Sequence, residues 1–156
     1  MDSTIKGTES DSYISAEDAK DYFLKRPHSQ SIEEEDDFEK FLMHATLILD
    51  SYIDWLGEKT TEDQALEWPR KNLTGIDKDT IPKDILTATC ELALVLLDDN
   101  VLQSVGLSNF ESMKISSMSL KISSNTSSDL IPRHILELVS QYGSINSGLN
   151  RTLIRT

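Results

Sequence analysis

The sequence predicts a mainly α fold: a helical bundle with a small β strand or hairpin element and an extended C-terminal arm. Apolar residues recur at i, i+3, i+4 and i+7 over residues 38–56, which is typical of an amphipathic helix. Residues 85–97 are apolar on most sides and indicate a buried helix. Residues 113–122 lack a helical stripe and alternate in part, which favours a strand. The alternating apolar side chains are Met118, Leu120 and Ile122.

The 156 residues fit one domain with extended ends. Residues 1–12 are polar and rich in Ser, Asp and Glu, so we expect a flexible acidic N-terminus. Residues 13–142 carry the periodic segments and should form the helical domain. Residues 143–156 have no core-forming pattern, and we expect a tail that is either disordered or ordered by a partner. The apolar and basic side chains of this tail are Ile145, Leu149, Arg151, Leu153, Ile154 and Arg155.

Two helices are expected before the middle of the chain. Ser15 and Asp18 resemble a capping box, which predicts a first helix over residues 16–26. The amphipathic pattern predicts a second helix over residues 32–56, and the acidic residues in its first turn suit the positive end of the helix dipole.

A compact corner is expected after the second helix. Thr61 and Gln64 match a capping box and predict the start of a short helix. Pro69 disfavours helical geometry at Trp68 and should end that helix within two turns. The residues expected to build the corner are Trp55, Gly57, Gln64, Trp68, Pro69, Arg70 and Glu91.

Two further helices complete the prediction. The third spans residues 82–98 and begins at a proline, which suits a first turn. Glu91 is the one charge in its apolar run. It should either emerge at an edge of the helix or meet a partner, for which Arg70 is the candidate. The last helix opens at Pro132 and should end at Gly143.

The charge is strongly negative and unevenly distributed. The formal net charge is −12, with 24 acidic and 10 basic residues in 1–106 but 3 and 5 in 107–156. Such a chain gains little from phosphate neutralisation, the usual source of nucleic-acid affinity. An acidic body with a slightly basic C-terminal end indicates two surfaces with different roles.

The sequence also predicts a soluble intracellular protein that is not an enzyme. Cys90 is the one cysteine, so no disulfide framework is expected. Residues 1–6 lack the features of a signal peptide, and the apolar run 92–97 is too short to span a bilayer. We predict no catalytic, cofactor-binding or metal-binding residue, because no nucleophile elbow, phosphate loop or metal-ligand spacing occurs.

Four stretches, taken in order, carry a family pattern. They are Tyr13…Ala19…Tyr22-Phe23…Arg26, then Ala45…Leu49-Asp50…Trp55…Gly57, then Gln64-Ala65-Leu66…Trp68-Pro69-Arg70, and then Ile81-Pro82…Ala88…Glu91-Leu92-Ala93-Leu94. As a set they resemble the head–tail connector (adaptor) proteins of tailed bacteriophages. The same pattern is similar to the phage domain often labelled DnaT-like, after a primosomal single-strand-binding protein.

The connector resemblance implies a ring of subunits, commonly twelve, made in the host bacterial cytoplasm and placed in the virion neck. Such a ring docks on the portal protein, contacts a downstream tail, nozzle or tail-completion protein, and lets genomic DNA pass without specific binding; no membrane is involved. The candidate contacts with the portal or a neighbour are Ile145, Leu149, Arg151, Leu153, Ile154, Arg155, Met118, Leu120 and Ile122. The alternative is a DnaT-like single-stranded-DNA-binding replication accessory protein, whose salt-sensitive binding the negative charge disfavours.

Overall fold

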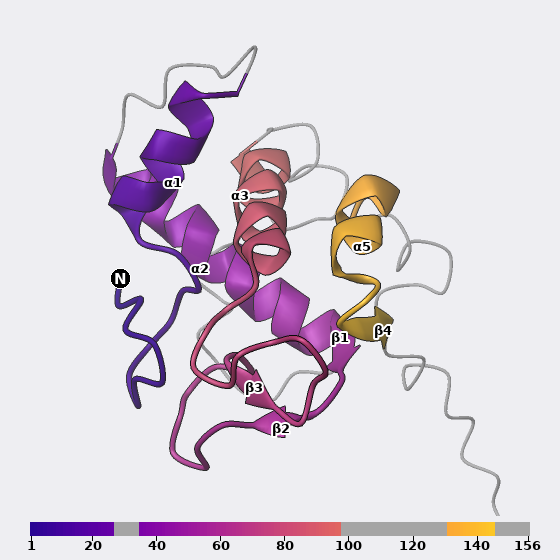
Figure 1. Cartoon of the computed structure of the whole chain (residues 1–156). Coiled ribbons are helices and arrows are strands. Elements are labelled where there is room, and N and C mark those ends of the chain that lie inside the picture. Colours follow the sequence, from indigo (N-terminus) through magenta and orange to yellow (C-terminus); the bar gives the residue numbers. More distant parts are fainter. Residues whose placement is uncertain (27–34, 98–130, 146–156) are drawn as a thin grey trace, which may run out of the picture.

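The computed structural model describes residues 1–26, 35–97 and 131–145 (Figure 1). Within these ranges the fold is α+β, with four helices and two small antiparallel sheets. The helices are α1 (Ala16–Leu24), α2 (Glu35–Tyr52), α3 (Lys83–Leu97) and α5 (Arg133–Val139). The strands are β1 (Ile53–Trp55), β2 (Glu58–Lys59), β3 (Arg70–Lys71) and β4 (Gly143–Ile145). None of the helices in these ranges has the length and hydrophobicity needed to cross a membrane.

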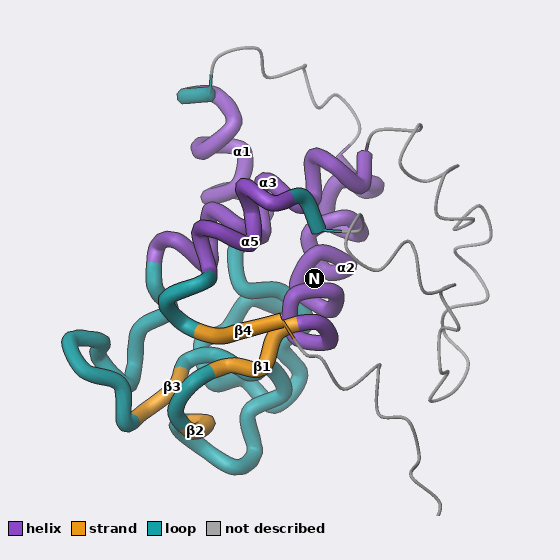
Figure 2. Tube along the Cα trace, turned by 90° about the vertical axis from the view of Figure 1, so that its right-hand side faces the viewer, coloured by secondary structure: helices purple, strands orange, loops and turns teal. Residues whose placement is uncertain are grey.

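The core lies where α3 packs between α2 and α5, with α1 against α2 (Figures 1 and 2). The inward residues of α3 are fully buried, among them Ile85, Leu92 and Leu96. Burying a side chain of this size contributes about 1.5–3 kcal/mol, so α3 supplies much of the stability of the fold. The predicted helix at 82–98 is confirmed as α3 within the described residues.

The N-terminal part packs onto this core. The Ser15 hydroxyl accepts a hydrogen bond from the backbone N–H of Asp18 and caps α1, which confirms the predicted helix start. Residues 1–12, expected as a flexible lead-in, run as a loop beside the body. The backbone N–H of Ala65 donates to the carbonyl of Gly7 at 3.0 Å, which ties this loop to the predicted corner.

The prediction of a mainly α helical bundle is wrong. The helix expected to continue to residue 56 ends at Tyr52, and β1 follows it directly. β1 pairs antiparallel with β4, placing Ile53 opposite Ile145 and Trp55 opposite Gly143. The helical stripe gave no sign of this change because Ile53 and Trp55 satisfy both helical and alternating spacing, while the pairing partner lies about ninety residues away.

Two other boundaries are corrected. The short helix expected after Thr61 does not form, and turns connect β2 to β3 in its place. Gly143 does not end a helix but opens β4, after α5 has ended at Val139. A Cβ atom on Gly143 would lie 2.7 Å from the carbonyl oxygen of Asp54, so glycine permits the close approach of β1 and β4. The strand predicted over 113–122 lies outside the described residues.

Candidate protein interface

Arg70 fixes the corner from β3. Arg70 is 8% exposed, and its guanidinium donates to the carbonyl oxygens of Leu56 and Gly57, both at 2.8 Å. It also donates to the Glu67 carboxylate at 2.5 Å. The planar guanidinium of an arginine can donate to several acceptors at once. Arg70 therefore links the chain after β1, at Leu56 and Gly57, to Glu67, which precedes β3.

Gly57 and Gln64 shape the backbone around this guanidinium. Gly57 has a φ of +74°, and a Cβ there would lie 2.4 Å from the Lys71 carbonyl oxygen. Gln64 accepts from the backbone N–H of Thr61 at 3.0 Å and donates to the carbonyl of Pro69 at 3.0 Å. The Thr61–Gln64 hydrogen bond expected of a capping box therefore exists, but it lies in a turn and not at the start of a helix. The Gln64 side chain also bonds to the Pro69 carbonyl, which stabilises the turn.

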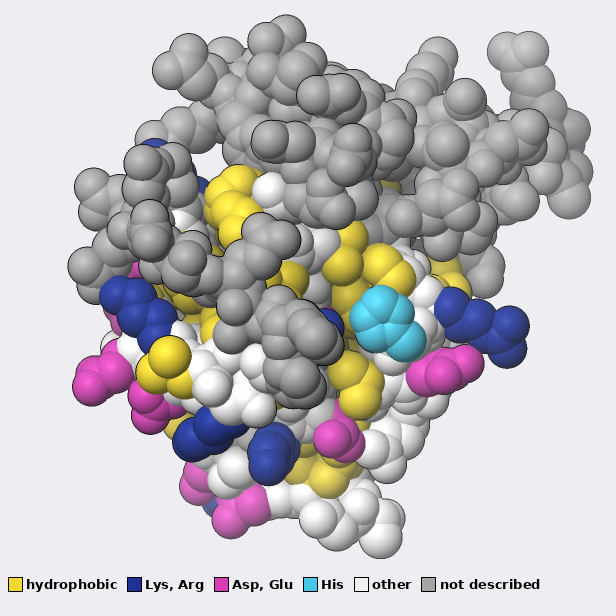
Figure 3. Space-filling view, turned by 90° about the horizontal axis from the view of Figure 1, so that it is seen from above, with side chains coloured by type: hydrophobic (Ala, Val, Ile, Leu, Met, Phe, Trp, Pro, Cys, Tyr) yellow, Lys and Arg dark blue, Asp and Glu magenta, His cyan; other side chains and the backbone are white. Residues whose placement is uncertain are grey.

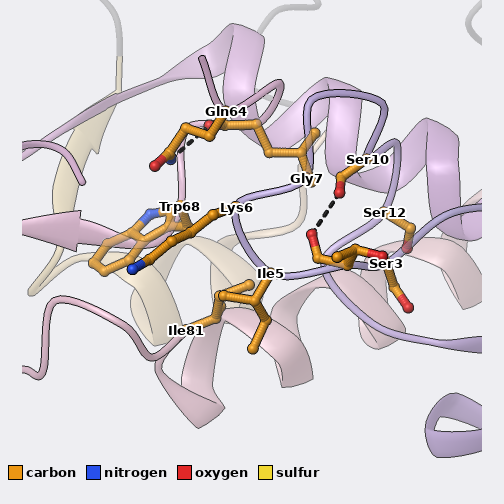
Figure 4. A pocket seen from close by; sticks show the side chains of 11 residues that line it. Ser3, Ile5, Lys6, Gly7, Ser10, Ser12, Gln64, Trp68 and Ile81 are labelled. Atoms are coloured by element: carbon orange, nitrogen blue, oxygen red, sulfur yellow. Dashed lines mark hydrogen bonds between the residues drawn. The ribbon is translucent and has the colours of Figure 1, made fainter. Parts of the chain in front are cut away.

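Trp68 is the hydrophobic centre of the corner. It is 1% exposed and meets the rings of Trp55 and Tyr142 edge-on, with centroids 5.7 Å apart in both pairs. The loop of residues 3–12 covers its other side, and Figure 4 shows Lys6 and Gln64 near the indole. The remaining space there does not admit a water-sized sphere, so it is a packed seam and not a ligand pocket.

Asp50, near the end of α2, connects the corner to the core. Its carboxylate accepts hydrogen bonds from the Tyr13 hydroxyl, the Trp55 indole N–H at 3.1 Å and the Glu67 backbone N–H at 3.2 Å. Burial raises the pKa of Asp50 to about 6, although the hydrogen bonds to the charged form oppose that shift. The sequence offered only a weak sign of this residue, a carboxylate beside the apolar stripe of a helix.

The structure places Glu91 away from this corner, and the predicted pairing of Glu91 with Arg70 is wrong. Glu91 is 8% exposed and accepts from the Arg26 guanidinium at 2.7 Å and the Tyr22 hydroxyl at 2.5 Å. Tyr22 lies in the last turn of α1, and Arg26 lies just beyond the end of that helix. Whether Glu91 pairs with Arg26 or with Arg70 depends on where α1 packs. No local sequence pattern specifies that packing.

Cys90, on α3, is a buried free cysteine. Burial raises the pKa of Cys90 to about 12, so its thiol stays protonated at neutral pH. In the same ranges, no group of three or more His, Cys, Asp or Glu side chains is placed to hold a metal ion.

An apolar groove lies beside this corner, between α5 and the β1–β4 sheet. Its volume is about 420 Å³. The side chains that line it include Ile53 from β1, Leu136 and Val139 from α5, and Ile145 from β4. Ile145 is 54% exposed, whereas Ile53 opposite it is buried. An exposed apolar surface at a sheet edge is typical of a protein-binding site.

On the face seen from above, the visible basic side chains do not form a continuous track. Figure 3 shows Lys and Arg scattered among Asp and Glu on the face seen from above. Several of the cations lie within 4.0 Å of a carboxylate oxygen: Lys6, Arg26, Lys59, Arg70, Lys71 and Arg133. Bases of single-stranded nucleic acid stack on exposed aromatic rings, but Trp55, Trp68 and Tyr142 are buried. The other aromatic residues of the described ranges are buried or, like Tyr22, Phe41 and Tyr52, partly buried.

The remaining predicted contact residues lie outside the described ranges. They are Met118, Leu120, Ile122, Leu149, Arg151, Leu153, Ile154 and Arg155. The structure therefore brings together Trp55, Gly57, Gln64, Trp68, Pro69 and Arg70, with Ile145 in the adjoining groove. The α5 side of this groove was not predicted, because the helical pattern of 132–142 did not show which face of the helix it leaves exposed.

One family model matches the chain, over residues 2–156, and its description is "Putative DnaT-like ssDNA binding protein". No curated protein and no solved structure matches the chain.

Proposed function

We propose that this chain, which belongs to the DnaT-like family whose model covers residues 2–156, is a structural subunit of a bacteriophage neck. In this proposal, copies of the chain form a ring that docks on the portal and links it to the next tail component. Genomic DNA passes through the ring without being bound, and the protein transforms no substrate.

The observation that carries the proposal is the surface charge. The chain has a net charge of −12, and many described cations are engaged with carboxylates. A DNA strand next to such a surface is repelled, because few phosphates can be neutralised. Repulsion of DNA by the channel wall suits a conduit, whereas it opposes binding by a DNA-binding protein. The ring and the portal come from the resemblance of the Trp68-Pro69-Arg70 corner and its flanking stretches to connectors.

The description of the family favours a second candidate, a single-stranded-DNA-binding accessory protein of replication, and none of the comparisons supports a connector. In this second case the DNA contacts would come from the C-terminal third, where four basic residues lie outside the described ranges. They are Lys114, Lys121, Arg151 and Arg155.

A fluorescence-anisotropy titration of labelled oligothymidylate separates the two candidates. The neck proposal predicts no saturation up to about 100 μM protein even at about 25 mM salt. Tight binding at low salt that weakens steeply toward about 200 mM salt supports the second candidate. In that case Arg151→Glu/Arg155→Glu should reduce the affinity, whereas the matched pair Lys78→Glu/Lys83→Glu should not.

A nonsense mutation in the gene tests the neck proposal directly. The expected lysate contains DNA-packaged or emptied heads and free tails that have not joined, as seen by negative-stain electron microscopy. Intact infectious particles from that mutant would refute the proposal.

A further inference from the structure

Residues 1–12 form a loop, the N-terminal loop, that is closed on itself (Figure 1). The Asp2 carbonyl accepts hydrogen bonds from the backbone N–H groups of Asp11 at 2.9 Å and Ser12 at 3.2 Å, and the Thr4 carbonyl accepts one from Gly7 at 2.9 Å. The backbone N–H of Asp2 also donates to the Asp11 carboxylate at 2.7 Å. Because these bonds join residues of the loop to one another, the loop can move as a unit without losing them.

The polar contacts that hold this loop against the body lie largely at the surface. They include an ion pair of Lys6 with Asp79, an ion pair of the N-terminal amine with Glu39 at 3.5 Å, and the hydrogen bond from the Ala65 N–H to the Gly7 carbonyl. The side chains of Asp79 and Glu39 are 52% and 37% exposed, so water screens both ion pairs. These contacts therefore add little to keep the loop in place.

Trp68 shows that the loop is an imperfect cover. The indole N–H of Trp68 is buried and has no hydrogen-bond partner among the described residues. The seam between the indole and the loop does not admit a water-sized sphere, and Figure 4 shows the indole nitrogen on the side of the ring that faces Gln64, which also lines the seam. A buried N–H without an acceptor destabilises this closed arrangement. An occupant that brings a carbonyl oxygen to the indole would satisfy a donor that the loop leaves unpaired.

We propose that the N-terminal loop is a lid, and that the surface beneath it receives the C-terminal residues 154–156 of a neighbouring copy of the chain. This Trp68 surface consists of Gln64, Leu66, Trp68 and Ile81, with Asp79 at its rim. The inference rests on the proposed ring and names the contact between adjacent subunits.

The C-terminus repeats the chemistry of the tip of the lid. The tip is Ile5-Lys6-Gly7 and the chain ends in Ile154-Arg155-Thr156, so each has an apolar, a basic and a small residue in the same order. In the lid, the apolar residue lines the Trp68 surface, the basic residue pairs with Asp79, and the small residue offers its carbonyl to Ala65. An extended chain end can make the same contacts and give a further carbonyl to the indole, since bound peptides combine main-chain hydrogen bonds with side-chain contacts.

The positions of the two partners favour a neighbouring copy over the same copy. Figure 1 shows the N-terminal loop at the left of the body and β4, after which residues 146–156 begin, at the right. A contact between two different faces of adjacent copies is heterologous, and its repetition about an axis closes a ring. Eleven extended residues reach about 36 Å, which is comparable to the diameter of a domain of this size. The segment can therefore reach an adjacent copy.

Analytical ultracentrifugation of the full-length chain tests the proposal. The mass should rise above the 17.6 kDa monomer with increasing concentration. Asp79→Lys and Arg155→Glu each place like charges in the contact, so each variant alone should associate about tenfold more weakly. Asp63→Lys is the matched control, because Asp63 is an exposed acidic residue of the same corner that does not line the Trp68 surface.

Reversing both charges gives the decisive result. The double variant Asp79→Lys/Arg155→Glu restores opposite charges across the contact and should associate as the wild type does, which a purely structural role of either residue does not predict. Lys6→Glu removes the ion pair of the lid and leaves the Trp68 surface intact, so it should associate about threefold more tightly. Circular dichroism melts verify folding, and Asp79→Asn replaces Asp79→Lys if the latter unfolds.

A wild-type chain that stays monomeric, an Arg155→Glu variant that associates like the wild type, or a double variant that is not restored would overturn the proposal. An unchanged or weaker association of Lys6→Glu would overturn the lid. Those outcomes would leave the neck role standing if the chain is still found in viral particles. Conversely, association through Asp79 and Arg155 in a chain that is absent from particles would remove the neck role alone.

Discussion

Asp50→Asn tests the buried hub that connects α2 with the corner. The substitution keeps the shape of the side chain and removes its titration. The amide oxygen can still accept from Tyr13 and Trp55, but the amide nitrogen then faces the Glu67 N–H and that hydrogen bond is lost. The loss costs about 1 kcal/mol at every pH.

The pH dependence carries the larger signal. Burial raises the pKa of Asp50 from 3.8 to about 6, so folding favours the protonated carboxyl. Its contribution to stability is therefore fully present below about pH 4 and is lost as the pH rises through about 6. A shift of about two units corresponds to about 3 kcal/mol. The free energy of unfolding of the wild type, minus that of the variant, should fall by about this amount between pH 4 and pH 7.

Urea denaturation followed by tryptophan fluorescence at several pH values measures this difference. Other carboxyl groups occur in both proteins and cancel in it. Asp54→Asn is the matched control, because it removes an exposed carboxylate on β1 that takes no part in the hydrogen bonds of Asp50. Parallel pH profiles for the wild type and Asp50→Asn, or a difference that grows with pH, would refute the assignment of Asp50 as a buried carboxyl group with a raised pKa.

Three other substitutions probe the corner and the sheet. Trp68→Ala should lower the free energy of unfolding by about 2–4 kcal/mol in urea, because it empties a fully buried site; a loss below about 0.5 kcal/mol would place Trp68 at a surface contact. Arg70→Lys should lower the free energy of unfolding by about 2 kcal/mol, because an ammonium group cannot donate to the Leu56 and Gly57 carbonyls in the same geometry. An unchanged urea midpoint would contradict this role. Gly143→Ala should separate β1 from β4, because the added Cβ would clash with β1. The expected result is faster hydrogen exchange at the Leu56 amide, which donates to the Tyr142 carbonyl at 2.8 Å. Unchanged protection of that amide would contradict the close approach of the two strands.

The helices could be predicted where local signals were strong. The Ser15 cap defined the start of α1, and the apolar run with a leading proline defined α3. These signals act within a few residues of the chain, so the sequence carries them directly. The corner was also anticipated as a packed unit around Trp68 and Arg70.

The sheets could not be predicted because their strands are two or three residues long and their partners are distant in sequence. Alternation over three residues cannot be separated from a helical stripe, so β1 was taken as the end of α2. β4 begins at Gly143, a residue type that also suits a helix end. The groove depends on this pairing, and for that reason only Ile145 among its described lining residues was anticipated.

The location of the protein in purified virus particles tests the central claim most directly. Cryo-electron microscopy of the particles, with quantitative mass spectrometry of their proteins, should show a ring of this chain between the portal and the tail, in about one copy per portal subunit. Absence of the chain from particles, with a place among the replication proteins of infected cells, would contradict the account.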